Sequence, residues 1–109
     1  TLDPPVVQSS MLRVASKNRG DSQNILLFSG PDENGPNGKG RSDLRIRVSV
    51  DEAKTWFDGP LIYDGKAAYS DLVRLGELRV GILFEAGDGN KSYQRIVFTP
   101  LSIPADGRF

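Results

Sequence analysis

Short apolar runs, each closed by Gly, Pro, Asn or Asp, follow one another along most of the chain. No window of a dozen residues repeats apolar positions at i, i+3, i+4 and i+7, so the pattern does not predict an amphipathic helix. Runs of this length and composition are typical of β-strands joined by short connections. The pattern therefore predicts an all-β, antiparallel fold with strands over residues 10–15, 25–29, 44–50, 60–63, 70–75, 78–85 and 93–99.

Two of these runs also predict which side chains are buried. Residues 25–29 are almost continuously apolar, which indicates a strand buried on both faces. Residues 44–50 alternate, with Arg45 and Arg47 on the face opposite the apolar positions Leu44, Ile46 and Val48. We expect the apolar face to join the core and the two arginines to lie on solvated surface.

The strands fall into a group of four and a group of three. A four-stranded antiparallel sheet is the unit of a β-propeller blade. The grouping predicts one blade over about residues 5–64 and a partial blade over about residues 65–101, followed by a frayed tail over residues 102–109. A seven-stranded β-sandwich fits the same periodicity and stays open as an alternative.

Composition narrows the chemistry. The chain has 109 residues, suited to one small domain, and its formal net charge is zero, without the basic stripe expected of a nucleic-acid-binding protein. It contains no Cys and no His, which excludes disulfides, thiolate chemistry and the usual zinc sites. We expect no cofactor and no metal, and we interpret the acidic segment 88–90 as a turn.

The ends and the longest apolar runs bear on cellular location. No run approaches the roughly 20 residues of a membrane-spanning helix, and the N-terminus has no signal-peptide pattern. The chain begins with Thr1 rather than Met, which leads us to expect a piece cut from a longer protein. Localisation is not predicted; a secreted or periplasmic parent is compatible with the sequence.

One motif lies between the third and fourth predicted strands. Residues 49–56, S-V-D-E-A-K-T-W, resemble the Asp-box of sialidases and related propellers, S-x-D-x-G-x-T-W. An Asp side chain can accept backbone N–H bonds across such a turn, and the Trp can pack as an apolar lid. The resemblance implies a structural role for Ser49, Asp51, Thr55 and Trp56. Ala53 stands where the motif has Gly, and a positive φ there would cost alanine about 1 kcal/mol.

Further stretches resemble the last third of an exo-α-sialidase, in the family's order and spacing. They cover nearly the whole chain: residues 5–13 (P-V-V-Q-S-S-M-L-R), 27–31 with 40–49, 68–72 (A-Y-S-D-L), and 81–85 with 93–98. Residue 7 is Val where the family has Cys. The resemblance implies part of a six-bladed sialidase propeller that acts on sialic-acid-containing glycans.

The same resemblance implies roles for individual residues. Tyr69 would be the nucleophile of a retaining glycosidase, the tyrosine exception among such enzymes. Arg41 would bind the substrate carboxylate as the third arginine of a triad, with Arg45 and Arg47 as competing candidates. Glu85 would orient another arginine of that triad. The residues alone also allow Tyr69 as a core or rim tyrosine and Glu85 as a solvated strand end.

The rest of such a site is absent from the chain. Two arginines, an acid aspartate and an activating glutamate would precede residue 5 in the family's order, so we expect the chain by itself to be inactive. Its expected partners are a sialylated glycan and the remainder of the same propeller. Two other interpretations remain: a sialidase-like propeller without catalysis, and a β-sandwich carbohydrate-binding module.

Overall fold

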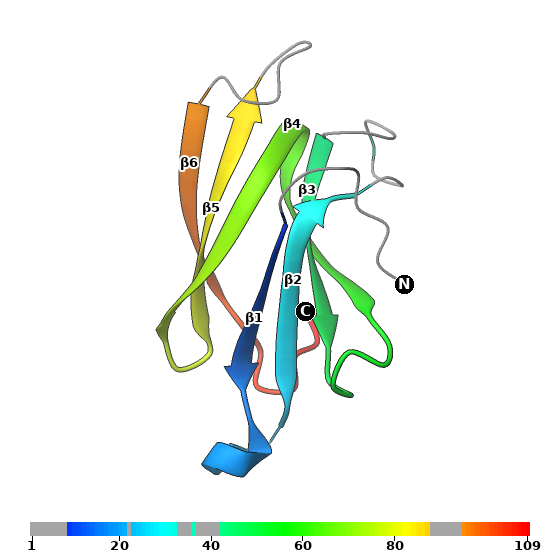
Figure 1. Cartoon of the computed structure of the whole chain (residues 1–109), viewed down its shortest axis with the longest axis vertical. Coiled ribbons are helices and arrows are strands. Elements are labelled where there is room, and N and C mark those ends of the chain that lie inside the picture. The colour runs from blue at the N-terminus through cyan, green and yellow to red at the C-terminus, as the bar shows by residue number, and fades with distance from the viewer. Residues whose placement is uncertain (1–8, 22, 33–35, 37–41, 88–94) are drawn as a thin grey trace.

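Six antiparallel strands form one sheet in the computed structural model, which describes residues 9–21, 23–32, 36, 42–87 and 95–109. Each strand pairs with the next along the chain, so the spatial order equals the sequence order (Figure 1). The elements are β1 (Ser10–Ala15), η1 (Lys17–Arg19), β2 (Ile25–Pro31), β3 (Ser42–Ser49), β4 (Phe57–Gly76), β5 (Arg79–Gly87) and β6 (Arg95–Ser102). The all-β, antiparallel prediction is confirmed.

β4 is the element that shapes the sheet. Its first arm pairs with β3 from Phe57 to Lys66, and its second arm pairs with β5 from Lys66 to Gly76. The strands predicted over residues 60–63 and 70–75 are therefore the two arms of one strand. Gly65, with φ +153°, lies where the arms meet, and only glycine enters that backbone region readily. β4 bends at Gly65, and its second arm runs beside β5 (Figure 1).

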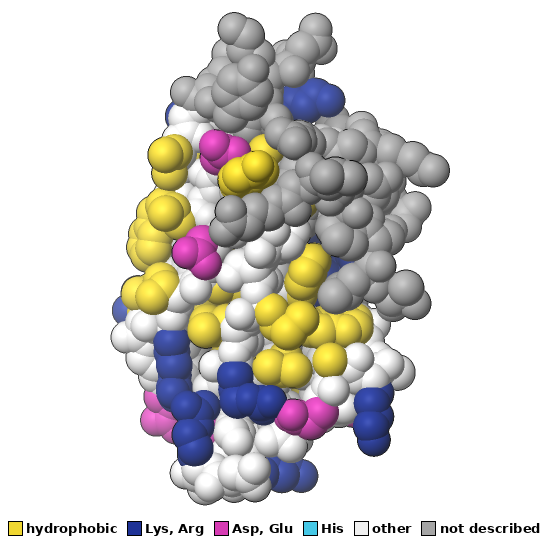
Figure 2. Space-filling view, in the orientation of Figure 1, with side chains coloured by type: hydrophobic (Ala, Val, Ile, Leu, Met, Phe, Trp, Pro, Cys, Tyr) yellow, Lys and Arg dark blue, Asp and Glu magenta, His cyan; other side chains and the backbone are white. Residues whose placement is uncertain are grey.

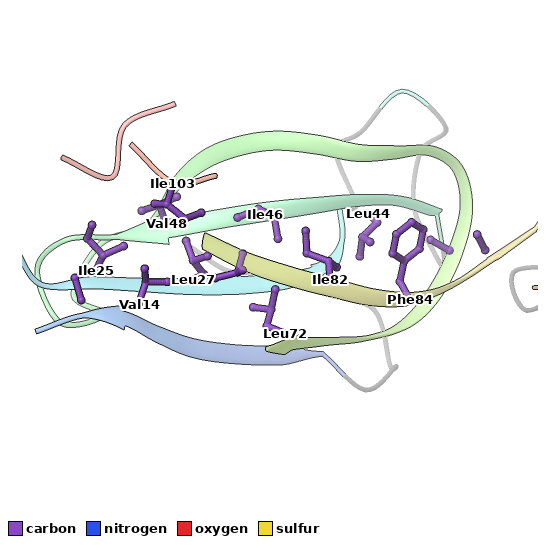
Figure 3. Packing of buried hydrophobic residues seen from close by; sticks show 14 residues of the cluster. Val14, Ile25, Leu27, Leu44, Ile46, Val48, Leu72, Ile82, Phe84 and Ile103 are labelled. Carbon is purple, nitrogen blue, oxygen red and sulfur yellow. The ribbon is translucent and has the colours of Figure 1, made fainter. Parts of the chain in front are cut away.

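This change of partner curls the sheet strongly, so that β1 and β2 come to lie against the second arm of β4. The core fills the space inside the curl (Figure 3). One side of the core comes from β1, β2 and β3, and the other from β4 and β5. Its largest fully buried side chains are Val14, Ile25, Leu27, Leu44, Ile46, Val48, Val80 and Ile82.

The strands β2 and β3 test the burial predictions. Leu44, Ile46 and Val48 are fully buried, as the alternation in β3 predicts. In β2 the inward side chains are buried, but Leu26 and Phe28 are only partly covered. The prediction that this strand is buried on both faces is wrong, because its outer face is covered only in part, with the Trp56 ring packed edge-on at 6.2 Å from the Phe28 ring.

The C-terminal tail is not frayed, contrary to the prediction. β6 continues past Pro100 to Ser102, and Ile103 is 4% exposed within the core cluster. The Ile103 N–H donates to the Leu78 carbonyl at 2.8 Å. Gly107, with φ +75°, lies close to Val48 and Val50. The tail closes one end of the core because its buried isoleucine and close-packed glycine fit there.

Candidate functional site

Tyr69 lies on the outward face of the second arm of β4, between the buried residues Ala68 and Ser70, and it is 46% exposed. The β4–β5 ladder shifts there: Ala67 pairs with Ala86, and Ser70 pairs with Phe84. Two residues of β4 therefore oppose one residue of β5, which is the geometry of a β-bulge. A bulge changes the direction in which a side chain points, and Tyr69 lies in this bulge.

Glu85 is the β5 residue opposite this bulge. The Tyr69 N–H donates to the Glu85 carboxylate oxygen Oε1 at 3.3 Å. The structure thus brings together two of the residues singled out from the sequence, through the tyrosine backbone. A carboxylate that accepts the N–H of a bulge residue helps to fix the local backbone, because the bulge interrupts the regular ladder there.

A shallow depression of about 140 Å³ lies at the same place. Its lining joins β4, β5 and β6 and consists of Tyr69, Ser70, Asp71, Leu83, Phe84, Glu85 and Ile96. The lining therefore combines a phenol, two carboxylates and apolar side chains. A phenol titrates near pH 10 and needs a base to act as a nucleophile at neutral pH. Apolar neighbours with a few polar groups suit the binding of a sugar or another small organic molecule.

Arg41, the expected carboxylate-binding arginine, lies outside the described residues. The competing arginines do not lie on solvated surface as predicted. Arg47 is 7% exposed, and its guanidinium contacts Asp32 Oδ1 at 2.8 Å and Asp58 Oδ1 at 2.9 Å. Arg45 Nε contacts Asp32 Oδ2 at 2.6 Å. The prediction was wrong because alternation identifies the face of a strand but not whether acidic residues elsewhere cover it.

Asp32 is the centre of this ion cluster, which consists of Asp32, Arg45, Arg47 and Asp58. Its side chain is 4% exposed, and each of its two carboxylate oxygens contacts one arginine. Its N–H donates to the Asp43 carbonyl at 2.8 Å, which fixes the residue just after β2. Arg45 also donates to the Gly59 carbonyl at 3.0 Å. The cluster ties the end of β2 to β3 and β4.

The turn of residues 49–56 connects β3 to β4, away from the depression beside Tyr69. The Ser49 hydroxyl donates to Asp51 Oδ1 at 2.8 Å and accepts the Ala53 N–H at 2.9 Å. The Thr55 N–H donates to Asp51 Oδ1 at 2.9 Å. Hydrogen bonds from the Thr55 hydroxyl and N–H, and from Ser49, lower the pKa of Asp51 to about 2. Asp51 thus organises the turn as a charged acceptor.

One contact at this turn was not expected from the sequence. Glu52 forms a two-pronged ion pair with Arg13 of β1, at 2.8 and 2.7 Å, which lowers the pKa of Glu52. Glu52 and Ala53 both adopt positive φ, 60° and 70°. Alanine therefore occupies the left-handed conformation that the family's glycine would adopt more readily.

A second feature missed in the sequence is a set of serines that links β1 and β2 to β4. Ser29 and Ser70 are buried, and their hydroxyl oxygens lie 2.8 Å apart. The signal available in the sequence was a serine at the end of an apolar run, Ser29, and a serine directly after Tyr69, Ser70. Such a pattern indicates a buried hydrogen bond only if the two strands face each other, which periodicity does not show.

The described residues contain no group of three or more side chains suited to hold a metal ion. Within the same part of the chain, none of the helices has the length and apolar character needed to span a membrane.

Comparison with known proteins points to one class of enzyme. No family model matches the chain. The chain nevertheless shows distant, partial similarity to sialidases. The relatives are the sialidases of two Vibrio cholerae O1 strains, each 33% identical over 82 residues, and the sialidase of Micromonospora viridifaciens, 31% identical over 86 residues. The matches cover 74% and 73% of this chain, but only 10% and 13% of the Vibrio and Micromonospora proteins. The chain thus spans about a tenth of the length of these relatives.

Proposed function

We propose that this chain is a sialidase segment that carries the nucleophile of an exo-α-sialidase. The observation that carries the proposal is Tyr69, half-exposed on a β-bulge and bonded through its N–H to Glu85, in a chain similar to sialidases. The longer protein would release terminal sialic acid from glycoconjugates and retain the anomeric configuration. The 109-residue chain alone would not hydrolyse sialosides, because the acid, the base and two arginines would come from elsewhere.

The chemistry explains why a tyrosine suits this substrate. The anomeric carbon of sialic acid bears a carboxylate, and a carboxylate nucleophile approaching it would meet like charge. A neutral phenol avoids this repulsion and attacks once a base removes its proton. The open depression beside Tyr69 supports this role because it leaves the Tyr69 phenol accessible.

Arg41 is proposed to bind the substrate carboxylate, since a guanidinium matches a carboxylate with two parallel hydrogen bonds. The ion cluster supports this choice: Arg45 and Arg47 already contact Asp32, so neither competes well for a substrate anion. Glu85 is proposed to orient another arginine of the triad. Its oxygen Oε1 accepts the Tyr69 N–H, which leaves the other oxygen for such a partner.

The fold assignment extends the same proposal. We propose that residues 49–56 form an Asp-box, and that about 5–64 and 65–101 belong to successive blades of a six-bladed propeller. The hydrogen bonds of Ser49 and Thr55 to Asp51 support the Asp-box. The partner change within β4 supports a boundary between two structural units near residue 65. The remainder of that propeller would then be the chain's main partner.

Hydrolysis of a fluorogenic sialic-acid glycoside tests the proposal. The comparison uses a longer sialidase that contains this chain, its Tyr69→Phe variant and the chain alone. We expect cleavage by the longer protein, at least a thousandfold loss in kcat for Tyr69→Phe, and no turnover by the chain alone. Tyr63→Phe is the matched control, because Tyr63 contacts Gly87 and Arg95 rather than the depression. A longer protein that does not cleave, or that tolerates Tyr69→Phe, would instead favour sugar binding.

A further inference from the structure

Three consecutive residues after Tyr69 are tied to the other half of the curled sheet. The first is Ser70, whose side chain points into the core. Its hydroxyl lies 2.8 Å from the hydroxyl of Ser29 and donates to the Ser29 carbonyl at 3.2 Å. β2 and β4 are not neighbours in the sheet order, so this link crosses the core rather than extending a ladder.

The other two tethered residues are Asp71 and Leu72, and both contact Ser10 of β1. The Leu72 N–H donates to the Ser10 hydroxyl oxygen at 3.1 Å. The Ser10 hydroxyl donates in turn to Asp71 Oδ1 at 3.2 Å. We call Ser10, Ser29 and Ser70 the serine clamp. It holds residues 70–72 against β1 and β2.

The clamp lies next to one of the two register shifts of the β4–β5 ladder. A bulge interrupts regular pairing at Tyr69, and the Tyr69 N–H donates to the Glu85 side chain. Strand pairing alone therefore constrains Ala68 and Tyr69 less than residues 70–74. The clamp on one side and Glu85 on the other supply the missing constraint.

We propose that the serine clamp positions Tyr69 in its outward orientation. The inference rests on the proposed function in one respect: it takes the outward orientation of Tyr69 to be the alignment of a nucleophile. If the clamp had only a structural role, its loss would lower the global stability of the chain. Replacing both buried hydroxyls by apolar groups of similar shape is nearly neutral for global stability, so a local effect at Tyr69 would report positioning. The double variant Ser29→Ala/Ser70→Ala therefore separates the two roles.

The first test uses the full 109-residue chain and needs no activity. Amide hydrogen exchange is followed by NMR in the wild type, in Ser29→Ala/Ser70→Ala and in Ser10→Ala. We expect amides of residues 69–72 to exchange at least about fivefold faster in both variants, while amides of β3 change less than twofold. Ser49→Ala is the control, since it removes a buried hydroxyl in the β3–β4 turn. Uniform acceleration, or none at residues 69–72, overturns the inference.

The second test uses the longer sialidase. We expect Ser29→Ala/Ser70→Ala to lower kcat about tenfold with KM within twofold, because a misplaced nucleophile affects the reaction more than substrate binding. Ser49→Ala should leave both parameters within twofold. If Tyr69→Phe abolishes activity but the double variant does not lower kcat, the inference fails and the proposed function stands. If Tyr69→Phe has no effect, the proposed function fails, and the exchange experiment still decides whether the clamp holds Tyr69.

Discussion

At the scale of single residues, the β3–β4 turn contains a backbone conformation that its sequence does not favour. Ala53 has φ +70° and is exposed, so its Cβ gains no packing in return. A left-handed conformation costs a non-glycine residue about 1–2 kcal/mol. The Asp51 hydrogen bonds nevertheless hold the turn closed. The hydrogen bonds of Asp51 therefore offset the strain at Ala53.

Ala53→Gly should therefore stabilise the chain. Glycine removes the strain but loses more conformational entropy on folding, which leaves a net gain of about 0.5–1 kcal/mol in the free energy of unfolding. Urea denaturation followed by tryptophan fluorescence measures this difference. Ala105→Gly is the control: Ala105 is also exposed but has no positive φ, and this change should destabilise. An Ala53→Gly variant less stable than the wild type would contradict the strain argument.

Asp51 gives the turn a pH dependence with a definite sign. Its pKa falls from an ordinary 3.8 to about 2, chiefly through the Thr55 hydroxyl. The folded state therefore binds this proton less readily than the unfolded state. The stabilisation from the ionised carboxylate is complete above pH 3.8 and is lost as the pH falls toward about 2.

The variant Asp51→Asn tests this dependence. It should be less stable than the wild type at neutral pH, because the amide is a weaker acceptor for Thr55. The gap between the two urea midpoints should narrow as the pH is lowered from 3.8 toward about 2. Thr55→Val removes the hydroxyl that donates to Asp51. The gap between its urea midpoint and that of the wild type should narrow over the same pH range. A gap independent of pH would show that the Asp51 charge does not stabilise the turn.

At the scale of elements, the ion cluster joins the end of β2 to β3 and β4. Asp32 is 3% exposed and lies between Arg45 and Arg47, so its carboxylate is the charge that both arginines share. Removing one member of a buried pair leaves an uncompensated charge, which costs about 3–5 kcal/mol. The cluster is thus sensitive to the loss of Asp32, whose carboxylate contacts both arginines.

Asp32→Asn should destabilise the chain by about 3 kcal/mol in urea denaturation. Asp58→Asn is the matched control because Asp58 pairs with the same arginine but its side chain is 65% exposed. That change should cost no more than about 1 kcal/mol. Equal effects of the two substitutions would mean that burial does not set the strength of these pairs.

Local patterns predicted the individual strands better than their relations. β1 was predicted with its observed bounds, and the inward residues of β3 were predicted from alternation alone. The bend of β4, the cover over Arg45 and Arg47 and the docked tail were not predicted. Each depends on residues far apart in sequence, such as Asp32 with Arg47 or Ile103 with Leu78. Periodicity reports the face of a strand, not what packs on that face.

The candidate site likewise combines residues that the sequence indicates with contacts that it does not predict. The resemblance to sialidases implies roles for Tyr69, Glu85 and the turn around Asp51, and these roles are proposals. The contact between Tyr69 and Glu85 could not be derived from spacing, because it depends on a one-residue shift of the β4–β5 ladder. The serine clamp depends on the curl of the whole sheet, since it joins strands that are not neighbours.

At the scale of the whole molecule, the curl covers one face of the sheet and leaves another open. Apolar side chains remain exposed on the outer face of β4, β5 and β6: Val73, Leu83, Ile96 and Phe98. We call these four residues the outer apolar row. Figure 2 shows hydrophobic side chains gathered along the β5–β6 side of the molecule. β6 is also the last strand in the order of the described sheet, so the row lies beside an open edge.

An exposed apolar row beside an open strand edge favours contact between copies of the chain. Sedimentation velocity of the 109-residue chain should show self-association that increases with concentration. Ile96→Lys places a charge at the most exposed position, where the residue is 72% accessible, and should weaken association at least tenfold, or about 1.4 kcal/mol. Met11→Lys is the matched control, because Met11 is equally apolar and 54% exposed but lies on β1. If Met11→Lys weakens association as much as Ile96→Lys, exposed hydrophobicity in general drives it. If only Ile96→Lys does so, the contact lies on the outer apolar row, the same face that carries Tyr69.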